Sequence, residues 1–225
     1  MRQKNPQNIL LFLTANTNNS QNIDKKEYRA GTGNVIVLDK QKEVEEAAID
    51  LTAKEGDFTV EFIPHDIKMT HDKKQVWVTA TASQEQLQAM SKALVEKTKR
   101  DVHVMMATDQ IVVIDTNTDK IISRIQIGVG LGLADLIIGK DSKYAYVAAE
   151  EGNAIYKVNT STHKVDLIQL PPESKPHQLA LSTDGTKLYA RNQANSNVYF
   201  ISTRTNEVRN QEGIEETKSL NWSGH

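Results

Sequence analysis

Short apolar runs separated by polar turns dominate this chain. Residues 111–114 and 198–201 are four-residue runs of β-branched and aromatic side chains, and apolar residues alternate along 121–127. Turn residues such as Asp184-Gly185 recur about every ten positions, and this pairing favours tight hairpins because glycine reaches positive φ without a Cβ clash. The pattern predicts an all-β protein made of short strands.

One sequence element recurs along the chain. His65-Asp66-Ile67, with the turn and strand that follow, matches His177-Gln178-Leu179, 112 residues later. A copy beginning Ala134-Asp135-Leu136 lies 43 residues before the second of these. Such spacing predicts a tandem repeat with an insertion between the first two copies.

A second element keeps the same period. Thr116-Asn117-Thr118, Thr160-Ser161-Thr162 and Thr203-Arg204-Thr205 start 44 and 43 residues apart, each after an apolar run. Each period contains four predicted strands. Four strands in 40 to 45 residues are typical of a β-propeller blade, so the predicted fold is a β-propeller of four-stranded antiparallel blades.

The repeat resembles the YVTN-type propeller repeats of exported bacterial and archaeal proteins. The resemblance rests on the Pro-His-Asp/Gln opening, the Asp-Gly-x-x-Leu-Tyr strand and the Ile-Asp-Thr-x-Thr-x-Lys-Ile turn, and extends over residues 9–209. It implies a periplasmic or extracellular location. It leaves the activity open, because similar propellers include lactonases, haem d1 proteins and binding modules.

The repeat divides the chain into four expected blades, and the whole of 1–225 is interpreted as one propeller domain or part of one. Two insertions, at 17–33 and 82–101, interrupt the first two blades. The four blades are expected at residues 9–50, 65–127, 134–170 and 177–211. Residues 11–16 match a second strand, so the first blade is expected to lack its own first strand. This division fits three alternatives: a fragment of a six- to eight-bladed parent, a complete four-bladed protein, or a protein that self-associates.

The two insertions have different compositions. The first is polar and predicts a loop. The second opens with a capping-box pattern at Ser83, and Leu87, Met90 and Leu94 follow at helical spacing. We therefore expect one amphipathic helix over 83–98, laid on the propeller face.

Composition excludes several classes of protein. The 27 basic and 29 acidic residues are interspersed, so nothing indicates nucleic-acid binding. The chain has no cysteine, which excludes disulfides, thiolate metal sites and cysteine nucleophiles. The apolar run 9–13 is too short to span a bilayer, so no membrane span is predicted.

Candidate ligand-binding chemistry lies at the start of each first strand. His65, His177 and the terminal His225 are expected at one mouth of the central channel, the mouth that the insertions overhang. Imidazole binds metals and haem and acts as a general base, so His65 and His177 are candidate metal ligands. The alternative is that they bond a neighbouring blade, and Ala134 interrupts the series.

Two carboxylates follow the histidine position. Asp66 and Asp135 could join a ligand site there, or could accept hydrogen bonds from backbone amides. The aromatic residues of the second strands are expected in the core between blades: Phe12, Trp77, Tyr146 and Tyr189. No catalytic motif appears in the sequence.

These observations favour a non-catalytic scaffold that binds a protein or small molecule at the propeller face. Two other hypotheses stay open. One is an enzyme, either lactonase-like or dependent on a metal or haem d1, although the sequence requires no cofactor. The other is a cell-surface structural repeat protein that self-associates through open blade edges.

Overall fold

The computed structural model describes residues 20–23, 25–55, 58–98, 108–192 and 197–211. Within these residues the chain forms four four-stranded sheets, in which every neighbouring pair of strands is antiparallel. Strands follow chain order across each sheet. The predicted all-β fold is confirmed.

The four sheets are named by their order in the chain. Sheet 1 consists of β1 (Ser20–Ile23), β2 (Lys26–Ala30), β3 (Asn34–Asp39) and β4 (Val44–Asp50). Sheet 2 consists of β7 (Phe62–Met69), β8 (Gln75–Ala82), β9 (Thr108–Asp115) and β10 (Lys120–Val129). Sheet 3 consists of β11 (Leu133–Ile138), β12 (Tyr144–Ala149), β13 (Ala154–Asn159) and β14 (Val165–Gln169). Sheet 4 consists of β15 (Pro176–Leu181), β16 (Lys187–Asn192), β17 (Val198–Ser202) and β18 (Val208–Gln211).

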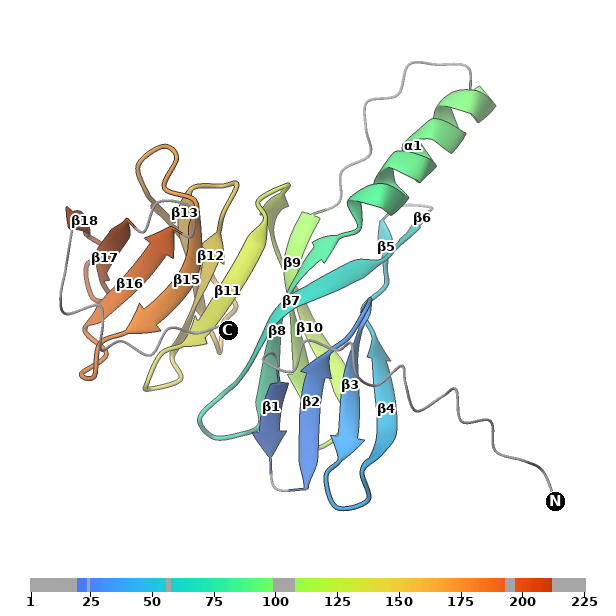
Figure 1. Cartoon of the computed structure of the whole chain (residues 1–225), viewed down its shortest axis with the longest axis horizontal. Helices are drawn as coiled ribbons and strands as arrows, with labels where there is room; N and C mark the ends of the chain where they lie inside the picture. Colours follow the sequence, from blue (N-terminus) through green and yellow to red (C-terminus); the bar gives the residue numbers. More distant parts are fainter. Residues whose placement is uncertain (1–19, 24, 56–57, 99–107, 193–196, 212–225) are drawn as a thin grey trace.

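Successive sheets pack face to face, as Figure 1 shows for the blue, green, yellow and orange sheets. Each interface has its own apolar cluster, centred on the aromatic residue of the preceding sheet's second strand: Tyr28, Trp77 and Tyr146. The predicted burial of Trp77 and Tyr146 between sheets is confirmed, because their exposed fractions are 0% and 3% and their clusters join two sheets. Tyr189 is 5% exposed but packs in a separate cluster of sheet 4 residues. In sheet 1 this position belongs to Tyr28, whereas Phe12 lies outside the described residues.

The expected loop at 17–33 is wrong. Strands β1 and β2 occupy most of this segment and complete sheet 1, which therefore has its own first strand. The segment alternates between the two faces of the sheet: Tyr28 is buried, while Glu27 and Arg29 lie on the other face and form an ion pair of 2.8 Å. Because only one side of β2 is apolar, the strand has a polar composition. Residues 11–16, expected as a strand, lie outside the described part of the chain.

The second insertion forms the predicted helix, α1 (Gln84–Thr98). The start of the helix is anchored: Leu87 is 2% exposed, and the Gln86 side chain accepts a hydrogen bond of 2.7 Å from the backbone of Glu61. Figure 1 shows α1 projecting beyond the sheets, so the expectation that it lies across the propeller face is wrong. Beside it is a hairpin that the sequence did not reveal, formed by β5 (Ala53–Glu55) and β6 (Phe58–Val60).

Candidate functional site

The first strands of sheets 2, 3 and 4 share an irregularity near their start. Register shifts lie between Pro64 and Asp66 in β7, between Leu133 and Leu136 in β11, and between Pro176 and Gln178 in β15. A bulge of this kind redirects a side chain out of the regular alternation. His65 lies within the register shift of β7, and His177 lies within that of β15. The repeated histidine therefore coincides with a repeated bulge of the backbone.

His65 has an exposed side chain that is held by the neighbouring strand. Its Nε2 lies 2.7 Å from the Oγ1 of Thr81 in β8. The surrounding protein lowers the pKa of His65 because it penalises the charged ring; nearby Asp109 opposes this shift, and the charge of His177 adds to it. Asp109 and His177 thus contribute to the electrostatic environment of His65.

His177 is paired with an acid from the preceding sheet. Its Nδ1 lies 3.0 Å from the Oε2 of Glu150, which follows β12. The two side chains are 26% and 34% exposed, so both can reach solvent.

Asp109 is a candidate that the sequence reasoning missed. It is 2% exposed, and its Oδ2 accepts hydrogen bonds from the backbone of Leu131 at 2.8 Å and of Gly132 at 3.1 Å. Burial raises its pKa, and these backbone bonds and His65 oppose the rise. Asp109 lies outside both repeated elements, and the one signal for it was a carboxylate next to the apolar run 111–114.

The loops around these residues lie on one side of the sheets. Ser83, at the start of α1, donates a backbone hydrogen bond of 3.0 Å to Glu61, just before β7. Glu150 donates one of 2.9 Å to Gly132, just before β11. The predicted geometry, in which the loop between the second and third strands meets the segment leading into the first strand, is therefore confirmed. We call the following residues the mouth cluster: His65, Thr81, Asp109, Glu150 and His177.

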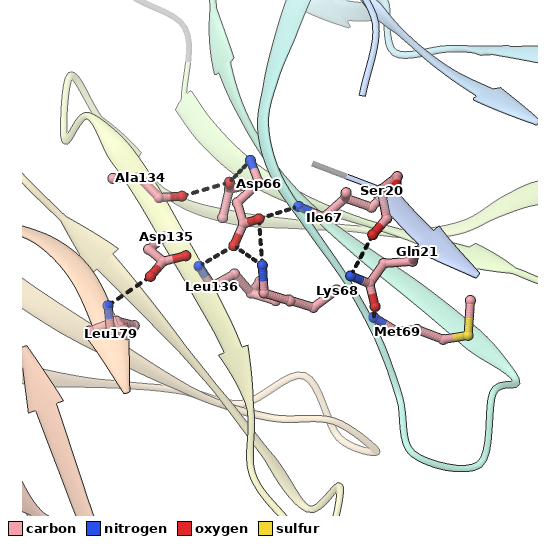
Figure 2. A network of polar contacts seen from close by, with 11 residues as sticks. Ser20, Gln21, Asp66, Ile67, Lys68, Met69, Ala134, Asp135, Leu136 and Leu179 are labelled. Carbon is pink, nitrogen blue, oxygen red and sulfur yellow. Dashed lines mark hydrogen bonds and ion pairs between the residues drawn. The ribbon is translucent and has the colours of Figure 1, made fainter. Parts of the chain in front are cut away.

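Asp66 and Asp135 are used differently, and Figure 2 shows their contacts. Oδ2 of Asp66 accepts a hydrogen bond of 2.8 Å from the backbone of Leu136 in sheet 3, and the Lys68 ammonium group lies 2.7 Å from its Oδ1. Oδ2 of Asp135 accepts one of 2.7 Å from the backbone of Leu179 in sheet 4. Both aspartates are 6% exposed.

The two aspartates thus form part of a seam between the first strands of successive sheets. Gln21 extends the seam to sheet 1, because its Oε1 accepts a hydrogen bond of 3.1 Å from the backbone of Met69. Of the two expectations for Asp66 and Asp135, the seam supports hydrogen bonding to backbone amides, here those of the next sheet. Their role as ligands stays a prediction.

Metal binding has limited support. Among the residues that the structure describes, no group of three or more histidine, aspartate or glutamate side chains could hold a metal ion. His225 lies outside the described residues. In that same part of the chain, no helix is long and apolar enough to cross a membrane.

No protein-family model and no curated protein matches this chain. Solved structures do match. Hydrazine synthase from Kuenenia stuttgartiensis has a TM-score of 0.58 and 18% identity, over 83% of this chain and 46% of that one. A candidate 6-phosphogluconolactonase from Bacteroides fragilis has a TM-score of 0.56 and 16% identity, over 85% and 55%. The extracellular domain of a candidate one-component system from B. thetaiotaomicron has a TM-score of 0.57 and 14% identity, over 88% and 24%.

These likenesses show the fold alone. Together with the four packed sheets, they define the chain as a protein of β-propeller architecture. The chain spans about half the length of the first two structures that it matches.

Proposed function

We propose that this chain is a non-catalytic β-propeller that serves as a binding scaffold, with its ligand site at the mouth cluster. The observation that carries the proposal is the position of His65 and His177. Both stand at bulges on first strands, next to loops from the same side of the sheets. Inserted loops in otherwise regular scaffolds are where binding functions concentrate.

The chemistry of the cluster suits recognition better than catalysis. Asp109 is buried and occupied by two backbone donors. His65 contacts a threonine hydroxyl, and His177 contacts Glu150. The cluster offers imidazole and carboxylate groups for hydrogen bonding to a polar ligand.

Thermal-shift screening with the full chain would test the binding role. The panel should contain sugar acids, short peptides and Zn²⁺, and wild type should be compared with His65→Ala/His177→Ala. We expect at least one compound to raise the melting temperature of wild type but not of the double variant. Thr183→Ala, on an exposed turn outside the cluster, is the matched control and should respond as wild type does. Equal responses in all three proteins would move the site elsewhere.

Hydrolysis of glucono-1,5-lactone distinguishes a scaffold from a lactonase. We expect the chain to leave the spontaneous rate unchanged. An acceleration abolished by His177→Ala would replace the scaffold proposal with an enzymatic one.

We also propose that the chain belongs among YVTN-type repeats and works outside the cytoplasm. The repeated elements of its sequence support the first part. For the second, one structure of the same fold is an extracellular domain. Fractionation of cells that express the full reading frame would test the location, and recovery with cytoplasmic markers would contradict it.

A further inference from the structure

The residue two positions before the histidine position differs among the three copies of the repeat. In sheets 2, 3 and 4 this residue is Ile63, Gly132 and Lys175. The position is therefore apolar in the first copy, has no side chain in the second and carries a charge in the third. Because equivalent positions of a repeat recur in successive sheets, these differences give the parts of the mouth different chemistry.

Ile63 lies on the same face of sheet 2 as Thr81 of the mouth cluster. The two residues pair directly across β7 and β8, and directly paired residues point to the same face. The Thr81 hydroxyl is also the group that His65 contacts, at 2.7 Å. The Ile63 side chain is 37% exposed, so an apolar group that covers it would remove apolar surface from water. Sheet 2 therefore supplies an accessible apolar contact beside the mouth cluster.

Gly132 connects sheet 2 to two glutamates of sheet 3. Its backbone N–H donates a hydrogen bond of 3.1 Å to Asp109, and its carbonyl accepts one of 2.9 Å from the backbone of Glu150. A Cβ atom on Gly132 would lie 3.2 Å from Cγ of Glu151, so the Glu151 side chain passes beside the glycine. Gly132 therefore brings Asp109 and the two glutamates together without adding a side chain among them.

The charges around Gly132 are mainly negative. Three carboxylates contact it or its neighbours: Asp109, Glu150 and Glu151. Lys175 lies 3.6 Å from Glu151, and His177, the partner of Glu150, is charged only when it is protonated. The protein around His65 lowers its pKa, so this ring adds no charge near neutral pH. The three carboxylates therefore meet at most two positive charges, and the mouth keeps a negative excess.

The two glutamates are accessible to a ligand. Their side chains are 34% and 60% exposed. Exposed ion pairs are weak, so the contact between Glu151 and Lys175 can be exchanged for a contact with a bound cation. Asp109, by contrast, is 2% exposed and contributes through its charge.

We propose that the mouth cluster binds an amine with an apolar body, whose ammonium group contacts Glu150 and Glu151 and whose apolar body covers Ile63. The inference rests on the proposed binding function and adds the chemical class of the ligand. An acid of the same shape would meet like charges, and a neutral ligand would leave the negative excess uncompensated as water is excluded. An amine without an apolar body would leave Ile63 exposed to water.

Four small probes test the class of ligand on the full chain, by NMR titration of the backbone amides at low salt. Isopentylamine carries both groups, isopentyl alcohol and 4-methylpentanoate replace the ammonium group by a neutral and an acidic one, and methylamine lacks the apolar body. We expect isopentylamine to bind at least tenfold more tightly than each of the others. Equal binding of the alcohol, the acid or methylamine would overturn the proposal, as would no binding of isopentylamine up to about 10 mM. A blocked Gly-Lys-Gly peptide separates the two sources of such an amine: tighter binding than isopentylamine assigns it to a protein partner, and weaker binding to a small molecule.

Two variants assign the two groups to their residues. Glu150→Gln/Glu151→Gln keeps the shape of both side chains and should weaken isopentylamine at least tenfold without affecting the alcohol. Ile63→Ser should weaken isopentylamine several-fold without affecting methylamine. Two exposed positions outside the mouth supply matched controls that should bind all probes as wild type does: Glu207→Gln and Leu167→Ser.

The outcomes also separate this inference from the binding function on which it rests. If His65→Ala/His177→Ala abolishes the binding of a sugar acid, a peptide or Zn²⁺ but isopentylamine does not bind wild type, the site exists and the amine class is wrong. If isopentylamine binds, but the glutamine and serine variants bind it as wild type does, the contacts assigned to Glu150, Glu151 and Ile63 are wrong.

Discussion

His65 and Asp66 are neighbours on one strand, yet they belong to different parts of the molecule. The His65 side chain is exposed at a bulge and contacts the threonine hydroxyl of Thr81. The Asp66 side chain is 6% exposed and bonds the backbone of the next sheet, its own strand and Lys68. The first position lies at the exposed bulge, whereas the next position joins the sheets. Recurrence in the sequence therefore does not by itself mark function.

The largest loss of stability should come from a substitution in the apolar core that supports both the mouth cluster and the seam. Trp77 is fully buried between sheets 2 and 3. Trp77→Ala removes a large side chain and leaves a cavity, so we expect it to lower the free energy of unfolding by about 3–5 kcal/mol. Urea unfolding followed by circular dichroism would measure this. A loss below about 1 kcal/mol would mean that the interface between the sheets is not packed as described.

A smaller loss should follow from opening the seam. Asp135→Ala leaves the buried backbone N–H of Leu179 without this acceptor, which should cost about 1–3 kcal/mol. Asp135→Asn keeps an acceptor oxygen in place and should cost less. Comparison of the two variants by urea unfolding would isolate the hydrogen bond. Equal losses would indicate that the carboxylate acts through its charge instead.

The smallest effect concerns the mouth cluster and is a change in proton affinity. The surroundings and His177 lower the pKa of His65, and Asp109 opposes them. His177→Ala should therefore raise the pKa of His65, and Asp109→Asn should lower it further. NMR titration of the histidine C2 protons would follow both changes. If neither variant moves the His65 resonance, these groups do not share one site.

The lowered pKa of His65 also determines the direction in which stability changes with pH. Because the pKa of His65 is lower when the chain is folded, its ring takes up a proton less readily in the folded state than in the unfolded state. His65 therefore costs stability as pH falls from its ordinary pKa toward its folded one. Replacement of His65 by alanine should remove this part of the acid sensitivity.

The repeat made the fold predictable, since a 43-residue period with four apolar runs specifies a blade almost regardless of the remaining residues. Secondary-structure prediction failed where the pattern of apolar residues was weak. Only one side of β2 is apolar, so Lys26–Ala30 has the polar composition of a loop. The β5–β6 hairpin has strands of three residues each, too short for a periodic pattern.

The location of the candidate site was predictable from the sequence, but its full set of residues was not. His65 and His177 could be found because they recur, and the antiparallel order of the strands indicated which loops would surround them. Asp109 and Glu150 could not be found, because neither belongs to the repeated elements and both reach the cluster through tertiary packing. The sequence left both a ligand role and hydrogen bonding to backbone amides open for Asp66 and Asp135, because periodicity cannot tell which face of a bulged strand a side chain occupies.

The most direct test compares the two neighbouring residues themselves. The free energies of unfolding of His65→Ala and Asp66→Ala should be measured by urea denaturation under identical conditions. We predict a loss within about 0.5 kcal/mol of zero for His65→Ala, whose side chain is exposed. We predict a loss of about 2–4 kcal/mol for Asp66→Ala, because it leaves the buried N–H groups of Ile67 and Leu136 without this acceptor. Equal losses, or a larger loss for His65→Ala, would contradict the division between a ligand-accessible mouth and a structural seam.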